Sequence, residues 1–172
     1  TNRRHYSRQA YNPKSALMEM MNWETDFVRS SFEDLLNEDR DLEGRVQRFA
    51  FYMKEIFSQF RDNNPKSRLP DHYHDDEYQM ASLYLACQYP TKYAPYTTSL
   101  LHTTLQKLGA VDIPLAADFP RYTKLLTTLR QFIVKDEKIM EQYVEFLRPQ
   151  DYQEESALLV WHFLKYVESK KE

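Results

Sequence analysis

The sequence predicts an all-α protein, a helical bundle of seven to eight helices. Apolar residues recur at three- and four-residue steps along most of the chain. No segment alternates clearly enough to be a strand, although residues 110–115 could form a short extended edge. Tight hairpins favour glycine, and the chain contains only Gly44 and Gly109. With 172 residues, the bundle is one domain or two packed subdomains.

A flexible basic arm is expected at residues 1–11, because this segment is polar and shows no apolar period. Its cations leave a second interpretation open, an arm that contacts phosphates. Asn12 followed by Pro13 predicts the start of a short helix, since these residue types favour the cap and the first turn. The apolar residues of that helix are Leu17, Met20 and Met21.

Two longer helices follow, from about residue 24 to 37 and from Asp41 to Phe60. The second has the longest amphipathic pattern of the chain, and a stripe so rich in phenylalanine normally lies in a core. Acidic residues cluster around residues 33–43, but their spacing does not match a calcium loop, which favours a solvated acidic face. The expected inward-facing residues are Phe27, Val28, Phe32, Leu35, Leu36, Leu42, Val46, Phe49, Ala50, Met53, Ile56, Phe57 and Phe60.

Residues 63–74 are the best candidate boundary between two subdomains. This stretch is rich in Asn, Pro, Ser and Asp and lacks an apolar period, so it predicts a loop. The expected organisation is an N-terminal helical subdomain at 12–62 and a C-terminal helical subdomain at 75–172.

The segment from His74 to Tyr96 combines an acidic start, an apolar helical stripe and a spaced aromatic end. Three acidic residues at 75–77 favour a helix N-terminus, where negative charge interacts favourably with the helix dipole. Pro90 ends this helix, because the residue before a proline disfavours the helical region. The apolar stripe consists of Met80, Leu83, Tyr84 and Cys87.

The last part of the chain predicts four more helices, the first of which ends at Gly109. Their expected starts or caps are, in chain order, Thr97 or Thr98, Phe119-Pro120, Asp136 and Asp151. Their apolar positions are Leu100, Leu101, Leu105 and Leu108; Tyr122, Leu125, Leu126, Leu129, Phe132 and Ile133; Ile139, Met140, Tyr143, Val144 and Leu147; and Leu158, Trp161, Leu164 and Tyr166 or Val167.

The composition argues against several function classes. Two glycines cannot build a phosphate-cradling loop or a dinucleotide fingerprint, so we expect no nucleotide cofactor. No apolar run approaches the ~18–20 residues of a membrane span and no signal peptide is evident, so we expect no membrane partner. A net charge of −3 gives no global attraction to nucleic acid, which would need a local basic patch.

Cys87 is the only cysteine of the chain. It excludes an internal disulfide and fits a reducing compartment, so we expect a cytoplasmic protein. Its position on the helical stripe favours a small buried apolar residue over a nucleophile.

Residues 72–77 are the one candidate metal cluster, because His72 and His74 precede three acids. The other histidines are scattered and the chain lacks facing Glu-x-x-His motifs, so a helix cap is favoured and no metal is expected. No nucleophile elbow or Cys–His arrangement is evident either, so the chain is not expected to be an enzyme. A helical metalloenzyme is the least favoured alternative.

The aromatic end of the His74–Tyr96 segment leaves two interpretations open. Tyr89, Tyr93 and Tyr96 surround Lys92 and are stiffened by two prolines. The rings either pack the chain as an elbow onto the core or form a surface that stacks on bases or holds a peptide. Arg121, Lys124 and Arg130 form a basic stripe on a later helix, which is either solvated or in contact with phosphates.

These motifs resemble a segment found upstream of the motor domain in bacterial McrB-like AAA+ restriction proteins. The resemblance covers roughly residues 72–169, and its elbow is the most specific part. The residues that carry it are His74-Asp-Asp-Glu, Ser82-Leu-Tyr-Leu, Tyr89-Pro-x-Lys92-Tyr-x-x-Tyr96, Leu108-Gly109, Tyr122-x-x-Leu125-Leu126 and Asp136-Glu137.

The resemblance implies a non-catalytic N-terminal recognition module of a restriction NTPase, with the AAA+ motor after residue 172. Such a module would recognise DNA, often with a modified base, and would contact other domains or subunits of the restriction complex. The residues expected at the interface are Tyr89, Lys92, Tyr93, Tyr96, Arg121 and Lys124. The alternative, from another class, is a protein-interaction or scaffold domain whose elbow is structural.

Overall fold

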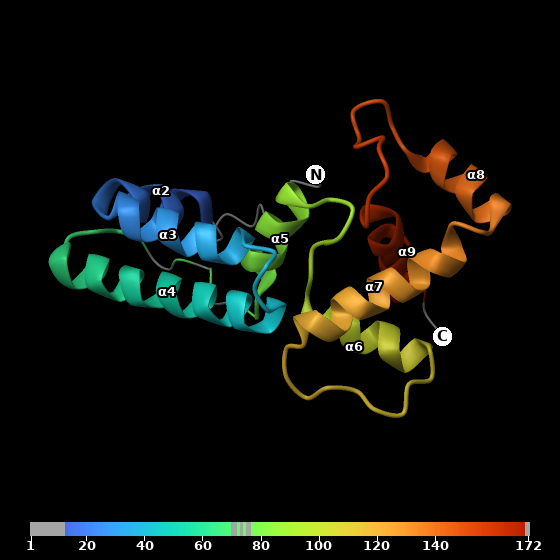
Figure 1. Cartoon of the computed structure of the whole chain (residues 1–172), viewed down its shortest axis with the longest axis horizontal. Helices are drawn as coiled ribbons and strands as arrows, with labels where there is room; N and C mark the ends of the chain where they lie inside the picture. Colours follow the sequence, from blue (N-terminus) through green and yellow to red (C-terminus); the bar gives the residue numbers. More distant parts are fainter. Residues whose placement is uncertain (1–12, 70–71, 73, 75–76, 171–172) are drawn as a thin grey trace. The chain divides into compact units, whose positions relative to one another are not determined.

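The structure is a computed structural model that describes residues 13–69, 72, 74 and 77–170 (Figure 1). These residues form helices and connecting loops without any strand, which confirms the predicted all-α class. The basic arm and the Asn12 cap lie outside the described residues. The described helices are α2 (Pro13–Trp23), α3 (Thr25–Leu36), α4 (Leu42–Asn63), α5 (Gln79–Gln88), α6 (Thr98–Lys107), α7 (Phe119–Ile133), α8 (Glu137–Phe146) and α9 (Leu158–Ser169).

The chain divides into two compact units, and the division falls between Ala81 and Ser82, within α5. We expected a boundary slightly earlier, in the loop at 63–74. No helix of the described residues is both long enough and apolar enough to cross a bilayer.

In the N-terminal unit, α2 and α3 pack on α4 around an aromatic core. The ring of Phe49 lies edge-on to Phe32 at 5.1 Å, and Trp23 lies edge-on to Phe60 at 6.0 Å. Asp41 starts α4 by accepting the backbone N–H of Gly44 at 2.6 Å. The buried apolar residues of these helices are Ala16, Met20, Val28, Leu35, Val46, Phe49, Met53, Ile56, Phe57 and Phe60. Phe27 was expected to face inward, but it is exposed and its ring lies edge-on to Tyr52.

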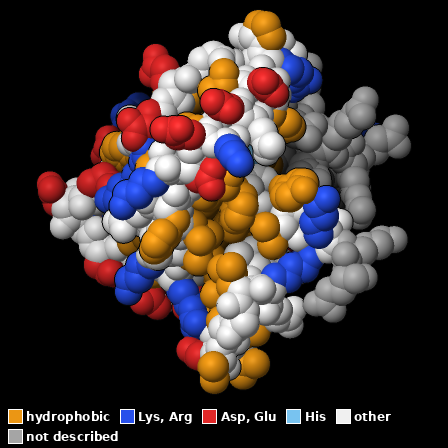
Figure 2. Space-filling model, turned by 90° about the vertical axis from the view of Figure 1, so that its right-hand side faces the viewer, with side chains coloured by type: hydrophobic (Ala, Val, Ile, Leu, Met, Phe, Trp, Pro, Cys, Tyr) orange, Lys and Arg blue, Asp and Glu red, His pale blue; other side chains and the backbone are white. Residues whose placement is uncertain are grey.

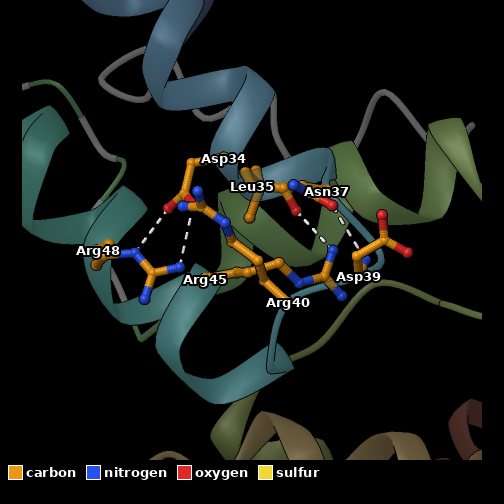
Figure 3. A network of polar contacts seen from close by, with 7 residues as sticks. All are labelled: Asp34, Leu35, Asn37, Asp39, Arg40, Arg45 and Arg48. Atoms are coloured by element: carbon orange, nitrogen blue, oxygen red, sulfur yellow. Dashed lines mark hydrogen bonds and ion pairs between the residues drawn. The ribbon is translucent and has the colours of Figure 1, made fainter.

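The turn from α3 to α4 is held by arginines, as Figure 3 shows. Arg45 is buried and donates to the backbone carbonyl of Leu35 at 2.8 Å. It also pairs with Glu38 at 2.7 Å. Asp34 accepts from Arg48 at 2.8 Å, and the Arg48 guanidinium lowers the pKa of the Asp34 carboxyl. Part of the acidic cluster therefore forms ion pairs rather than a solvated face.

The start of α5 differs from the expected acidic cap. The helix begins at Gln79, and the two residues before it, Glu77 and Tyr78, have φ values of 48° and 65°, so neither has a right-handed helical conformation. Residues 75 and 76 lie outside the described part of the chain. His72 and His74 are buried with their rings stacked at 6.0 Å.

In the C-terminal unit, α9 packs against both α6 and α7. The side chain of Thr97 accepts the N–H of Leu100, and Gly109 ends the α6 segment at φ +70°. Asp118 caps α7 by accepting the N–H of Arg121 at 2.8 Å. The buried apolar residues of these helices are Leu100, Leu101, Leu105, Phe119, Tyr122, Leu126, Ile133, Leu159, Val160 and Leu164.

One expectation about the last helix is wrong. Asp151 does not cap α9, because its carboxylate binds the backbone and the guanidinium of Arg148, and α9 begins only at Leu158. Of the two alternatives at the end of this helix, Tyr166 is exposed and Val167 is partly buried, and Leu164 faces the core as expected.

The expected inward face of α5 is only partly correct: Met80 is buried, but the other three expected residues are not. Cys87 is exposed, and Leu83 and Tyr84 are only partly buried. The buried positions of this helix are Met80, Ala81, Ser82 and Leu85. The predicted stripe and the buried face are offset by about one residue. The apolar pattern of so short a helix does not distinguish between these two faces.

Candidate functional site

The tyrosine elbow belongs to the core of the C-terminal unit. Tyr93 and Tyr96 are 1% and 0% exposed. Both rings lie against Phe119, with centroids at 6.0 and 5.6 Å, and Tyr96 lies edge-on to Tyr122 at 5.2 Å. This corrects the expectation of accessible rings at these two positions, because a ring enclosed on both faces by other side chains cannot stack on a base.

Hydrogen bonds from the elbow fix the start of α7. The hydroxyl of Tyr96 accepts the N–H of Asp118 at 2.9 Å, and the hydroxyl of Tyr122 donates to the carbonyl of Pro95 at 2.9 Å. The N–H of Tyr96 donates to the hydroxyl of Ser82 at 2.9 Å. The hydroxyls of Tyr96 and Tyr122 and the N–H of Tyr96 therefore each have a partner within the fold, as expected for a structural elbow.

The remaining predicted elbow residues lie at its edge. Tyr89 is partly buried and lies edge-on to Tyr93 at 6.3 Å. Lys92 is exposed, and its ammonium lies 5.2 Å from the centroid of the Tyr93 ring. In this cation–π contact, the ammonium group of Lys92 interacts with a ring of its own fold.

Two of the three cations expected on the basic stripe are engaged by neighbouring loops. Arg121 donates to the carboxylate of Asp112 at 2.9 Å and also to its backbone carbonyl. Arg130 pairs with Glu155 and donates to the carbonyl of Thr91. Lys124, by contrast, is exposed on α7. The structure thus does not assemble the six predicted residues into one surface.

The described residues can be checked for two features of catalytic sites, a metal-binding group and a cavity with an acid–base pair. They include no group of three or more His, Cys, Asp or Glu side chains that could hold a metal ion. A shallow cavity of about 210 Å³ lies in the N-terminal unit, lined by Glu24, Phe27, Ile56 and Gln59. Its single carboxylate has no partner base or nucleophile among the lining residues, so the cavity offers no acid–base pair.

Helix α8 is the most unusual element of the C-terminal unit, because none of its residues is buried. Its apolar residues recur at three- and four-residue steps and so form one face. Val144 and Phe146 on this helix are 65% and 63% exposed, and Phe132 near the end of α7 is 67% exposed. Seen from the side of these helices, hydrophobic side chains gather in the middle of the face, with charged side chains around them (Figure 2). We call Phe132 and Val144 the α7–α8 surface; Phe146, two residues after Val144, lies on another side of α8.

His162 on α9 holds one edge of α8. Its Nδ1 lies 3.3 Å from the hydroxyl of Tyr143, and its ring lies 5.4 Å from the ring of Phe146. Burial lowers the pKa of His162 and raises the pKa of Tyr143. Both shifts favour the neutral forms. Helix α8 is thus attached through a few aromatic side chains rather than through a packed helical face.

A second exposed apolar feature is the loop between α6 and α7. Val111 and Leu115 are fully exposed, on either side of Pro114. The bonds from Arg121 to Asp112 anchor this loop. Arg121, expected to contact phosphate, thus instead positions an apolar loop.

Sequence reasoning missed the α7–α8 surface for a definite reason. The apolar stripe of α8 was identified from its period, but a period shows only which residues share a face and not whether another element covers that face. The available signal was local: the linkers on both sides of α8 are short or polar, and two strongly charged turns flank it.

The chain matches no protein-family model, no curated protein and no solved structure. The resemblance to McrB-like proteins therefore depends on the quoted residues alone.

Proposed function

We propose that this chain is a non-catalytic helical module that binds another protein through the α7–α8 surface. The observation that carries the proposal is α8 itself, an amphipathic helix without a single buried residue. An exposed apolar patch of this kind usually marks an interaction site on a folded domain.

The energetic argument is that covering these side chains is favourable. Burial of a fully exposed Val or Phe side chain contributes about 1.5–3 kcal/mol, and Phe132 and Val144 are each more than half exposed. Aromatic residues are also enriched in the energetically important centres of protein interfaces.

DNA recognition by an McrB-like module, the function that the resemblance implies, has weaker support from the geometry. It would need base contacts from Tyr93 and Tyr96, which are buried, and phosphate contacts from Arg121, which binds Asp112. Lys92 and Lys124 alone remain exposed among the six candidates. A restriction complex could still supply the protein partner of the module, through its motor or another subunit.

We propose a reducing, cytoplasmic compartment for this module. Cys87, its only cysteine, is an exposed free thiol. Exposed thiols persist where glutathione and thioredoxin keep them reduced.

The test is affinity capture with the full chain from an extract of the cells that produce it. The bait variant combines Phe132→Ser with Val144→Ser, and Gln142→Ser on the polar side of α8 serves as the matched control. We expect a specific protein to be retained by the wild type and by Gln142→Ser and to be lost with the double variant. Equal capture by all three baits would argue against the α7–α8 surface.

A further inference from the structure

We infer that the occupant of the α7–α8 surface is a second copy of this chain, with α8 of each protomer packed on α7 of the other. The inference rests on the proposed function, because it names the partner of the same surface. It is carried by the opposite charges that border the exposed apolar residues of the two helices.

The exposed stripe of α7 is basic. Lys124, Thr128 and Phe132 follow at steps of four residues, so they lie on one side of the helix, and Lys135 follows its end. All four side chains are exposed. This side of α7 thus presents one large aromatic ring between two ammonium groups.

The exposed stripe of α8 is acidic. Glu137, Glu141 and Val144 lie at steps of four and three residues, and all three are exposed. His162 contacts the helix on the side of Tyr143 and Phe146. The acidic edge around Val144 is therefore the part of α8 that its own chain leaves uncovered.

The two stripes complement each other in both apolar content and charge. Glu137 and Glu141 both precede Val144. If Val144 packs on Phe132 of a second copy, these glutamates therefore approach Lys124 when the two helices run parallel and Lys135 when they run antiparallel. Because each protomer has both stripes, a two-fold arrangement makes this contact twice and closes the assembly as a dimer. A partner without cations beside its apolar residues would leave Glu137 and Glu141 unpaired at the interface, which disfavours it.

Sedimentation equilibrium of the full chain across the micromolar range tests the inference. We expect a monomer–dimer equilibrium that shifts toward monomer at high salt, because exposed charge pairs are screened. The acidic variant combines Lys124→Glu with Lys135→Glu, and the basic variant combines Glu137→Lys with Glu141→Lys. Circular dichroism of each variant checks that the helices remain folded.

Each charge variant alone should be monomeric, because two stripes of one sign then face each other. Mixed in equal amounts, the two variants should form a heterodimer, since both contacts again join opposite charges. Lys138→Glu on the polar side of α8 is the matched control and should dimerise like the wild type.

Three results would overturn the inference: a monomeric wild type, a dimer unaffected by either charge reversal, or no restoration on mixing. These results would not by themselves contradict the proposed function. A monomeric wild type that still captures a different protein through Phe132 and Val144 would keep the interaction module and remove only the second copy as its partner.

Discussion

The hydroxyl of Tyr96 accepts the backbone N–H of Asp118 at 2.9 Å, and Asp118 is the residue that caps α7. A side chain of the elbow thus fixes the first turn of a helix that follows more than twenty residues later in the sequence. The elbow is therefore a structural joint that sets the position of α7, and through α7 the position of the exposed Phe132.

Removal of this hydroxyl should destabilise the chain moderately. We expect Tyr96→Phe to lower the free energy of unfolding by about 1 kcal/mol or more, because the N–H of Asp118 is left without its acceptor. Tyr96→Ala should cost about 3 kcal/mol or more, because it also leaves a cavity. Tyr166→Phe, at an exposed ring, is the matched control and should have little effect in urea unfolding.

The buried guanidinium of Arg45 is expected to be a major stabilising group of the N-terminal unit. Arg45→Met leaves the carbonyl of Leu35 and the carboxylate of Glu38 without their donor, so we expect a loss of about 2–4 kcal/mol. Arg29→Met removes a guanidinium from the exposed pair with Asp26 and should change stability by less than about 1 kcal/mol. Similar unfolding curves for the two variants would contradict the role of Arg45.

The ion pairs of Asp34 predict a loss of stability in acid. Because Arg48 lowers the pKa of Asp34 in the folded state, ionised Asp34 stabilises the fold above its unfolded pKa. This contribution is lost as the pH falls below about 4 and through the folded pKa. Asp34→Asn should therefore cost roughly 1.5–3 kcal/mol at about pH 7 and much less at about pH 2, measured by urea unfolding. Asp26→Asn, in an exposed pair, should show little difference between the two conditions.

Acid should also loosen the attachment of α8. Burial lowers the pKa of His162, so the folded state favours the neutral ring, and this contribution is complete above the unfolded value of about 6.5. As the pH falls from there through the folded pKa, protonation favours release of the ring and of Tyr143. We expect amide exchange in α8 to rise relative to α7 between about pH 7 and about pH 5, after correction for intrinsic rates. His162→Phe keeps an aromatic ring without a titratable group and should remove this pH dependence.

The geometry predicts little DNA binding by the chain alone. We expect no more than weak, non-specific, salt-sensitive binding to methylated or unmodified duplexes in fluorescence anisotropy. The double variant Lys92→Ala and Arg121→Ala should bind as the wild type does. Tight binding of a methylated duplex that is lost in this variant would favour the McrB-like function instead.

Local chemistry predicted the helix starts well, because a cap depends on a few neighbouring residues. The predicted starts at Thr97 and Asp136 follow from side chains that accept the first backbone N–H groups, and the predicted start at Phe119-Pro120 lies directly after the Asp118 cap. Asp151 has the same cap chemistry, but Arg148, three residues earlier, takes its carboxylate. A competing partner of this kind is invisible to a pattern of residue types.

Burial of a helix face could be predicted only where the element that covers the face could be predicted as well. The Phe49 stripe of α4 is buried as expected, whereas Phe27, Phe132 and Cys87 are exposed despite lying on apolar stripes. Whether a stripe is covered depends on elements far away in the sequence, which no local period contains. For the same reason, the sequence left two interpretations of the elbow open, because it does not show that Phe119 packs against Tyr93.

The division between the two units falls inside α5, and this limits where the chain can be divided into expression fragments that fold. Met80 and Ala81 precede the division and Leu85 follows it, so a cut there would interrupt the hydrogen-bond ladder of one helix. Expression fragments that represent the two units should therefore overlap, each containing all of residues 79–88. Two fragments that merely abut at Ser82 would each carry half a helix too short to persist by itself.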